Sequence, residues 1–368
     1  MQIGTVKELK TRERRVGITP AGVRELVGSG HSVTVEASAG TAIGFSDDAY
    51  VAAGATVVET AEDVFDRAEL IVKVKEPQPA EIARLRSHHT LFTYLHLAPD
   101  PDQATGLMRS GATCIAYETV TDGRGRLPLL TPMSEVAGRL SVQVGCRYLE
   151  ALEGGQGRLL GGVTGVAPAR VLIIGGGISG RNAADMAIGL GADVTILDRS
   201  IDRLRELGDI YNGRARCLYS TSVVLDELLP EADLVIGAVL VPGAAAPRVV
   251  THQQVRRMRA GSVLVDIAID QGGCFETSRP TTHDDPVYSV DGVTHYCVTN
   301  MPAAVARTST QALTNATLPY IIAIASAGVE ASMRRDPGLA AGLNVMGGRI
   351  TNAQVAASLG FNEGLAAS

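Results

Sequence analysis

Short apolar stretches rich in β-branched residues alternate along the chain with segments in which apolar residues recur every three or four positions. The first pattern is typical of buried strands and the second of amphipathic helices. Their alternation predicts an α/β protein with mainly parallel sheets, because parallel strands need a crossover helix between them. The expected strands are Ile3–Val6, Ser32–Glu36, Leu70–Lys75, Thr90–Leu95, Thr113–Tyr117, Arg170–Ile174, Asp193–Leu197, Ala215–Tyr219, Leu234–Val239, Ser262–Ile267 and His295–Thr299.

Several segments carry the helical pattern, and one of them marks a boundary. The helix that begins at Thr131 extends to about Leu152 and ends at the Gly-rich stretch 154–165, and we interpret it as the crossing between two domains. The last helix comes so late that it can pack back on the first domain. The expected helices are Thr19–Val27, Pro79–Arg86, Pro101–Arg109, 131–152, Ser179–Leu190, Ile201–Leu207 and Gln311–Ala327.

The composition is that of a globular protein with two domains of ordinary size, since 45% of the 368 residues are hydrophobic and 20% are charged. The net charge of −6 argues against nucleic acid as a partner, because binding a phosphate backbone needs a basic face. The five cysteines have neither metal-ligand nor redox-motif spacing, which indicates reduced thiols. Without signal-peptide anatomy or a membrane-spanning apolar stretch, we expect a cytoplasmic protein with no membrane partner.

The histidines suggest no metal site. His31, His252, His283 and His295 have no acidic or cysteine partner at ligand spacing, so we assign no metal. The neighbouring His88–His89 pair is expected on a surface turn.

The segment Val171–Gly180 contains the glycine pattern of a dinucleotide-binding turn. Gly175, Gly177 and Gly180 directly follow a buried-type strand and open a helix rich in small residues. In such a turn the first glycine permits the tight bend, the second lets the backbone approach a pyrophosphate, and the third lets helix and strand lie close together. The helix N-terminus offers N–H donors to the phosphates. The alternative is a Gly-rich turn in an α/β domain that binds no nucleotide.

An acidic residue, Asp198, ends the next expected strand. A carboxylate there accepts hydrogen bonds from the ribose hydroxyls of the adenosine and repels a 2′-phosphate, so it favours NAD over NADP. The basic Arg199 follows directly and weakens that preference. We expect NAD as the cofactor.

Four polar residues follow the ends of expected strands. Arg15 lies in the loop after the first strand, Lys75 ends the third, His96 follows the fourth, and Asp270 follows the strand Ser262–Ile267. Because ligands gather outside the carboxyl ends of strands in open α/β sheets, a cleft between the domains would bring the four together. Solvated strand ends, a helix cap and a packed histidine are the alternative interpretations of the individual residues.

The four side chains suit the oxidation of an amino acid. An arginine can bind the substrate carboxylate at two points, and a lysine can polarise the oxygen of a keto acid. A histidine with a pKa near neutrality can move the protons when water adds to an iminium ion. A carboxylate beside the nicotinamide can hold the amino group or orient the water.

Seven segments resemble the family of alanine dehydrogenases and pyridine nucleotide transhydrogenases. The likeness extends from residue 1 to about 327. One departure is Gly176, where the family usually has alanine. The segments are Gly4–Glu8, Glu13–Pro20, Val72–Pro77, Leu91–Ala98, Met133–Ser141, Val265–Gly273 and Val298–Pro302.

The resemblance implies an NAD-dependent oxidation of L-alanine to pyruvate and ammonia. Arg15 and Lys75 would bind the substrate, His96 would be the general acid and base, and Asp270 would be the second catalytic group. A homo-oligomer, commonly a hexamer, is also implied. Besides the three glycines of the turn, the residues expected around NAD are Ser134, Ile178, Ser179, Asp198, Arg203, Ser220, Val239, Leu240, Ile267, Asn300 and Met301.

We therefore expect two Rossmann-like, doubly wound domains with a cleft between them. Residues 131–304 would form the NAD-binding domain, and residues 1–130 with 305–368 the catalytic domain. Three other functions stay open: the nucleotide-binding subunit of a proton-translocating transhydrogenase, a relative of saccharopine dehydrogenase, and a non-enzymatic NAD-binding protein.

Overall fold

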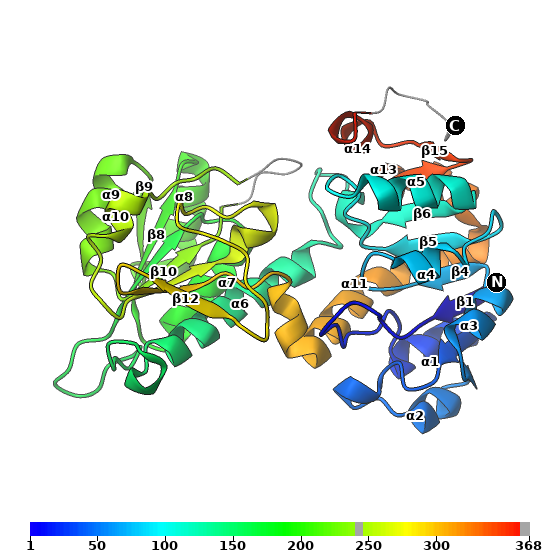
Figure 1. Ribbon diagram of the computed structural model, residues 1–368, viewed down its shortest axis with the longest axis horizontal. Coiled ribbons are helices and arrows are strands. Elements are labelled where there is room, and N and C mark those ends of the chain that lie inside the picture. Colours follow the sequence, from blue (N-terminus) through cyan, green and yellow to red (C-terminus); the bar gives the residue numbers. More distant parts are fainter. Residues whose placement is uncertain (240–245, 361–368) are drawn as a thin grey trace. The chain divides into compact units, whose positions relative to one another are not determined.

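A computed structural model describes residues 1–239 and 246–360 of the chain (Figure 1). The chain forms two compact units. Unit 1 comprises Met1–Met133 and Val305–Ser368, and unit 2 comprises Ser134–Ala304. The C-terminal segment thus returns to the unit in which the chain begins.

Unit 1 is built on an eight-stranded sheet in the order β15-β14-β6-β5-β4-β1-β2-β3. The strands β1 to β6 pair in parallel, whereas β14 is antiparallel to both β6 and β15. The bounds are β1 Gln2–Thr5, β2 Ser32–Glu36, β3 Thr56–Val58, β4 Leu70–Val72, β5 Thr90–Thr93, β6 Thr113–Ala116, β14 Leu343–Met346 and β15 Arg349–Ile350.

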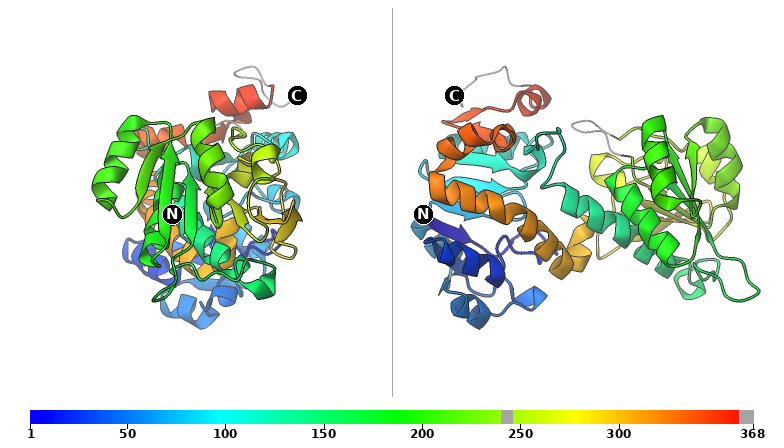
Figure 2. Two further views of the ribbon diagram at one scale, coloured as in Figure 1. Left: turned by 90° about the vertical axis from the view of Figure 1, so that its left-hand side faces the viewer. Right: turned by 180° about the vertical axis from the view of Figure 1, so that it is seen from behind.

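Helices cover both faces of this sheet. Figures 1 and 2 show α4 and α5 on one face and the long α11 on the other. Buried Phe65, Leu107 and Val345 belong to the core on the α5 side. The helices are α1 Pro20–Gly28, α2 Asp47–Ala52, α3 Ala61–Arg67, α4 Pro79–Ile82, α5 Pro101–Ser110, α11 Ala306–Ala327, α12 Val329–Arg335, α13 Pro337–Ala341 and α14 Ala353–Ser358, with 3₁₀ turns η1 Thr41–Ile43 and η2 Tyr117–Thr119. A further 3₁₀ turn, η6 Met301–Val305, belongs to unit 2 up to Ala304.

Unit 2 has a seven-stranded sheet in the order β12-β13-β11-β10-β7-β8-β9. All pairs are parallel except β12 with β13. The order reverses between β7 and β10, which is the doubly wound arrangement of nucleotide-binding sheets. The strands are β7 Arg170–Ile174, β8 Asp193–Asp198, β9 Arg216–Tyr219, β10 Leu234–Gly237, β11 Val263–Asp266, β12 Val287–Val290 and β13 Val293–Tyr296.

Close backbone approaches fix the helices of unit 2. A Cβ at Gly138 of α6 would lie 2.2 Å from the Ser179 carbonyl oxygen of α7, so only glycine lets the two helices meet there. On another side of the sheet, Leu225, Val255 and Phe275 contribute to a buried core. The helices are α6 Thr131–Tyr148, α7 Ile178–Gly189, α8 Ile201–Tyr211, α9 Ser222–Leu228 and α10 His252–Val255, with 3₁₀ turns η3 Ala151–Glu153, η4 Leu229–Glu231 and η5 Ile267–Gln271.

The predicted α/β fold class is confirmed, and some element limits were wrong. The strand predicted to Lys75 ends at Val72, and the one predicted to Leu95 ends at Thr93. The helix predicted to about Leu152 ends at Tyr148, and α11 begins at Ala306 and contains Pro319. No single helix in the described ranges could span a membrane; one pair, Met301–Ala327 joined to Val329–Arg335, meets the length and composition criteria but is bent by 119°.

Candidate active site and nucleotide site

In unit 1, the predicted substrate-binding and catalytic side chains follow the carboxyl ends of adjacent strands. Arg15 lies in the loop after β1, Lys75 follows β4 and His96 follows β5. A fourth group, Glu118, follows β6. The sheet order β6-β5-β4-β1 makes these four strand ends neighbours along one edge.

Arg15 is buried and held by Glu13. Its Nε and Nη2 donate to the two carboxylate oxygens of Glu13 at 2.7 and 2.5 Å, and its Nη1 lies 3.1 Å from the Met133 Sδ. The side chain of Arg15 is 2% exposed and that of Glu13 is fully buried. Burial would lower the pKa of Arg15, but the hydrogen bonds and charge of Glu13 outweigh it and raise that pKa. The guanidinium therefore stays cationic in a fixed plane.

Lys75 is mostly buried beside an acidic neighbour. Its Nζ lies 3.2 Å from Glu76 Oε2, and Lys10 forms an ion pair with the other oxygen of the same carboxylate. Burial would raise the pKa of Glu76, but the charge of Lys75 and the hydrogen bond from Lys10 outweigh it and lower the pKa to about 2. Glu76 is thus a carboxylate at neutral pH and can hold the Lys75 ammonium at the strand end.

His96 has an unusual backbone and an accessible ring. Its φ of 48° is in the left-handed region, which residues with a Cβ rarely adopt. The ring stacks on Tyr94, with centroids 5.7 Å apart and an interplanar angle of 7°, and the side chain is 44% exposed. Its Nδ1 lies 3.9 Å from Glu118 Oε1, and its backbone N–H donates to the same oxygen at 2.6 Å.

Beneath this edge lies a buried ionic cluster that the sequence analysis missed. The Nζ of Lys73, which is fully buried, lies 3.0 Å from Glu8 Oε2 and 2.6 Å from Glu81 Oε1. The other oxygen of Glu8 accepts from the backbone N–H groups of Val74 and Lys75 at 2.7 and 3.4 Å. Because these N–H groups bond to Glu8 rather than to a strand, β4 ends before Lys75. In the sequence, the only feature that could have indicated Glu8 and Lys73 as part of the site is their position near strand ends.

In unit 2, the glycine turn joins β7 to α7 at the point where the strand order reverses. A Cβ at Gly175, whose φ is 102°, would lie 2.6 Å from the Ala238 carbonyl oxygen, and one at Gly180 would lie 1.8 Å from the Gly175 carbonyl oxygen. At Gly177, the residue before α7, a Cβ would meet no atom within 4 Å. The turn is therefore closely packed at Gly175 and Gly180 but open at Gly177, where a pyrophosphate would fit.

Asp198 organises this turn from the end of β8. Its two oxygens accept from the Gly176 and Ser200 backbone N–H groups at 2.7 and 2.8 Å. Arg203 Nε donates to the Gly176 carbonyl oxygen at 2.6 Å. At Gly176, where alanine was the expected family residue, a Cβ would lie 2.6 Å from Leu207 Cδ1, so glycine makes room for this leucine.

Asp270 is an exposed residue of the turn η5 after β11, and its Oδ1 accepts from the Asn300 backbone N–H at 3.2 Å. The buried Asp266 holds this turn. Its carboxylate accepts from the Ala268 N–H at 3.0 Å, the Cys274 N–H at 2.9 Å and the Ser278 hydroxyl at 2.5 Å. Burial raises the pKa of Asp266. Asp266 lies within the predicted strand Ser262–Ile267 and not after its end, so its position in the sequence did not indicate this role.

The other predicted nucleotide-contacting residues in the described part of unit 2 lie at strand ends or helix starts. Ser220 follows β9, Val239 follows β10, and Ile267 follows β11; Asn300 and Met301 follow β13 at the start of η6. Ile178 and Ser179 open α7, and Ser134 is in the first turn of α6. Leu240 lies outside the described residues.

Within the described ranges, no group of three or more His, Cys, Asp or Glu side chains is placed to hold a metal ion.

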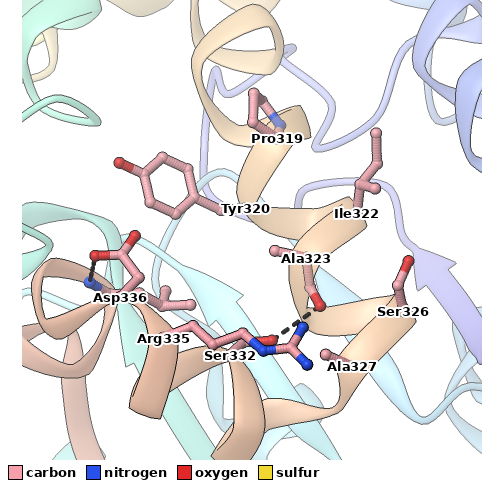
Figure 3. Close-up of a pocket in the computed structure, with 10 residues that line it drawn as sticks. Pro319, Tyr320, Ile322, Ala323, Ser326, Ala327, Ser332, Arg335 and Asp336 are labelled. Atoms are coloured by element: carbon pink, nitrogen blue, oxygen red, sulfur yellow. Dashed lines mark hydrogen bonds between the residues drawn. The ribbon is translucent and has the colours of Figure 1, made fainter.

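Figure 3 shows a cavity in unit 1, between α11 and the α12–α13 segment, with a volume of about 530 Å³. Pro319, Ile322 and Ala323 form part of its wall, and Arg335 and Asp336 lie on the opposite side. None of the predicted site residues lines it, so it is separate from the strand-end clusters.

Comparisons with known proteins agree with this architecture. Residues 4–137 match the N-terminal domain model of alanine dehydrogenase/PNT, and residues 141–353 match the C-terminal domain model. The chain is 58% identical to an alanine dehydrogenase of Halomonas elongata, with 100% of this chain and 99% of the relative covered. It is 52% identical to the Bacillus subtilis alanine dehydrogenase, with 98% and 95% covered.

Solved structures agree as well. One L-alanine dehydrogenase superposes with a TM-score of 0.95 at 52% identity and covers 98% of this chain, while 99% of that protein is covered. A transhydrogenase from Sinorhizobium meliloti shares the fold, with a TM-score of 0.83 at 24% identity over 96% of this chain and 99% of that protein. The family and the Rossmann-like sheet imply a nucleotide cofactor. The chain belongs to the alanine dehydrogenase and pyridine nucleotide transhydrogenase family.

Proposed function

We propose that the chain catalyses the reversible oxidation of L-alanine to pyruvate and ammonia, with NAD as the hydride acceptor. The observation that carries the proposal is the full-length identity of 49–58% to proteins named alanine dehydrogenase. The adjacent strand ends that present Arg15, Lys75 and His96 provide side chains for this reaction.

Arg15 and Lys75 are proposed to bind the substrate. The Arg15 guanidinium is held in one plane by Glu13, and a planar guanidinium matches the geometry of a carboxylate. Lys75, next to the ionised Glu76, supplies a positive charge near the oxygen that becomes the keto group. Both cations are largely buried, so water competes weakly for them.

His96 and Asp270 are proposed to manage the protons. When bound, NAD accepts the hydride from Cα of neutral alanine, which leaves an iminium carbon. His96 then takes a proton from the water that attacks this carbon, and returns a proton to the nitrogen as ammonia leaves. Asp270 would hold the amino group or orient the water. The balance is alanine with an uncharged amino group, NAD⁺ and water on one side, and pyruvate, ammonia, NADH and a proton on the other.

The glycine turn of unit 2 fits the proposed NAD. The open side at Gly177 leaves room for the pyrophosphate, and the N-terminus of α7 offers backbone donors there. Asp198 would accept from the ribose hydroxyls, and its negative charge disfavours a 2′-phosphate. We therefore expect NAD rather than NADP.

The test is the formation of NADH, followed by absorbance, with a panel of amino acids at alkaline pH. We expect activity with L-alanine, and reduction of pyruvate only when ammonium is present. A clear preference for glutamate or lysine would contradict the proposal, as would NADH binding without turnover. Hydride transfer from NADH to an NADP analogue without any amino acid would instead indicate a transhydrogenase.

The assembly and location are proposed on separate grounds. We propose a homo-oligomer, a hexamer by family resemblance, which light scattering coupled to size exclusion can measure. A cytoplasmic location agrees with cysteines that form no disulfide. Fractionation of cells expressing the full chain tests it.

A further inference from the structure

The backbone of His96 is held in a conformation that its own side chain disfavours. With a φ of 48°, it is one of few residues other than glycine in the left-handed region within the described part of the chain. Such outliers persist only where the surrounding contacts determine them, and they are common at functional sites. The inference below rests on the proposed role of His96.

The carboxylate of Glu118 makes those contacts. Its Oε1 accepts from the His96 N–H at 2.6 Å and from the Leu95 N–H at 3.1 Å, and its Oε2 lies 3.2 Å from the same Leu95 nitrogen. On the opposite side of the peptide, Gln103 Nε2 donates to the Leu95 carbonyl oxygen at 2.7 Å. Because the Glu118 carboxylate accepts both backbone N–H groups of this bend, Glu118 is its dominant partner.

Glu118 is itself fixed by its neighbours along the chain. Tyr117 is buried against Phe92, with centroids 4.4 Å apart, and its hydroxyl donates to the Lys73 carbonyl oxygen at 3.0 Å. Thr119 Oγ1 accepts from Asn344 Nδ2 at 2.7 Å. The carboxylate between these two anchors is therefore a rigid acceptor.

The bend determines where the imidazole lies. One ring face stacks on Tyr94, whose hydroxyl donates to the Leu129 carbonyl oxygen at 2.6 Å. The Nδ1 edge faces Glu118 Oε1 at 3.9 Å, which is beyond hydrogen-bond reach. Rotation of the His96 backbone out of the left-handed region would carry the ring off Tyr94.

We propose that Glu118 is a positioning residue for His96, which acts by holding the Leu95–His96 backbone rather than by touching the substrate. This positioning depends on how far the acceptor oxygen of residue 118 extends from the backbone. An amide of the same length can replace it in part, whereas a shorter carboxylate cannot.

Three variants separate this role from general stability. Glu118→Gln keeps an acceptor oxygen at the same distance from the backbone of residue 118. Glu118→Asp keeps the carboxylate but brings it one methylene closer to that backbone. Glu118→Ala removes the acceptor oxygens and the charge. The matched control is Asp122→Asn. Asp122 lies a few residues further on and also accepts two backbone N–H groups, from Arg124 and Arg126, but it does not contact His96.

The readouts are kcat and KM for alanine, NADH affinity, and hydrogen exchange of the peptide that covers residues 94–97. For Glu118→Ala and Glu118→Asp we expect kcat to fall at least about tenfold, with NADH affinity within about twofold and faster exchange of that peptide. Glu118→Gln should retain kcat within about threefold, and Asp122→Asn should match the wild type.

Equal or higher kcat in Glu118→Asp than in Glu118→Gln would overturn the proposal, because charge and not reach would then matter. Wild-type kcat in Glu118→Ala would overturn it too. If Glu118→Ala does not fold, the comparison of the other two variants decides. Failure of the proposed function is distinct, since it would appear as a wild-type protein without alanine turnover.

Discussion

Arg15 and Glu13 form a two-point ion pair in which both side chains are almost completely buried, with N–O distances of 2.7 and 2.5 Å. Removing one partner of such a pair costs more than the pair contributes, because a buried charge is left without compensation. The arginine that we expect to bind substrate therefore depends on a glutamate two positions earlier.

The first prediction is that Glu13→Gln weakens both stability and substrate binding. The neutral amide no longer compensates the buried guanidinium, so we expect the free energy of unfolding to fall by about 3 kcal/mol. KM for alanine should rise at least about tenfold because the guanidinium loses its fixed plane. Urea unfolding and steady-state kinetics measure the two effects. The exposed pair Arg205–Asp202 offers a control, since Asp202→Asn should change neither.

The second prediction concerns His96→Ala. Loss of a general acid and base costs about 10²–10⁴ in rate, so kcat for alanine oxidation should fall by that factor. Tryptophan is absent from the chain, and NADH binding can be followed by the fluorescence of the nucleotide itself. We expect its affinity to be unchanged, because the residues proposed to bind the nucleotide belong to unit 2. Turnover like that of the wild type would remove His96 from the reaction.

The third prediction compares two glycines of one turn. An alanine Cβ at Gly177 meets no atom within 4 Å, and the φ of −64° there suits any residue, so Gly177→Ala should melt like the wild type. It should nevertheless bind NADH at least about tenfold more weakly, because the methyl group enters the space of the pyrophosphate.

Gly180→Ala should behave differently. Its Cβ would lie 1.8 Å from the Gly175 carbonyl oxygen, so the backbone must move, and we expect a loss of about 1–3 kcal/mol in stability without ligand. Thermal melts and nucleotide titrations of both variants give the comparison. Equal stability loss in the two variants would contradict the close approach of α7 to β7.

The fourth prediction is that Asp198→Asn relaxes the choice between NAD and NADP. The amide keeps an acceptor oxygen for only one of the Gly176 and Ser200 N–H groups, and it no longer repels a 2′-phosphate. The ratio of kcat/KM for NAD to that for NADP should fall at least about tenfold. An unchanged ratio would mean that another group sets the specificity.

The fifth prediction concerns pH and Glu76. Its pKa is lowered from 4.5 to about 2 in the folded chain, so it contributes stability above pH 4.5, which is lost as pH falls through about 2. Glu76→Gln should be less stable than the wild type by about 1–3 kcal/mol at pH 7. The difference should shrink between pH 4.5 and 2, which denaturant unfolding at stepped pH measures. A constant difference would show that packing rather than charge is responsible.

Hydrophobic patterning predicted most of the fold because period and length are local properties. The strands Ser32–Glu36 and Arg170–Ile174 were predicted at their observed limits. The helix predicted from Thr19 begins at Pro20, with the Thr19 hydroxyl capping it by accepting from the Gly22 N–H. The short strands β3, β12, β14 and β15 were missed, since two to four residues show no clear period.

What the sequence could not predict depends on contacts between distant residues. His89 was expected on the surface but is 2% exposed, because its Nδ1 accepts from the Arg86 N–H and its Nε2 pairs with the Phe65 carbonyl oxygen. Glu8 and Glu118 lie 66 and 22 residues from the backbone N–H groups of Val74 and His96 that they bind. Glu8 and Glu118 also lie near strand ends, as the predicted site residues do, but no local pattern indicates that they bind distant backbone N–H groups.

The return of the C-terminal segment to unit 1 sets an order for synthesis on the ribosome. The strand β14 pairs with β6, and α11 packs against α1, although unit 2 separates these pairs along the chain. Unit 2 is contiguous and can close once Ala304 has emerged, while the sheet that starts at Met1 waits for its last strands. The nascent N-terminal half thus exposes the open edge of β6 until β14 has been synthesised, and an unpaired strand edge can pair with other chains.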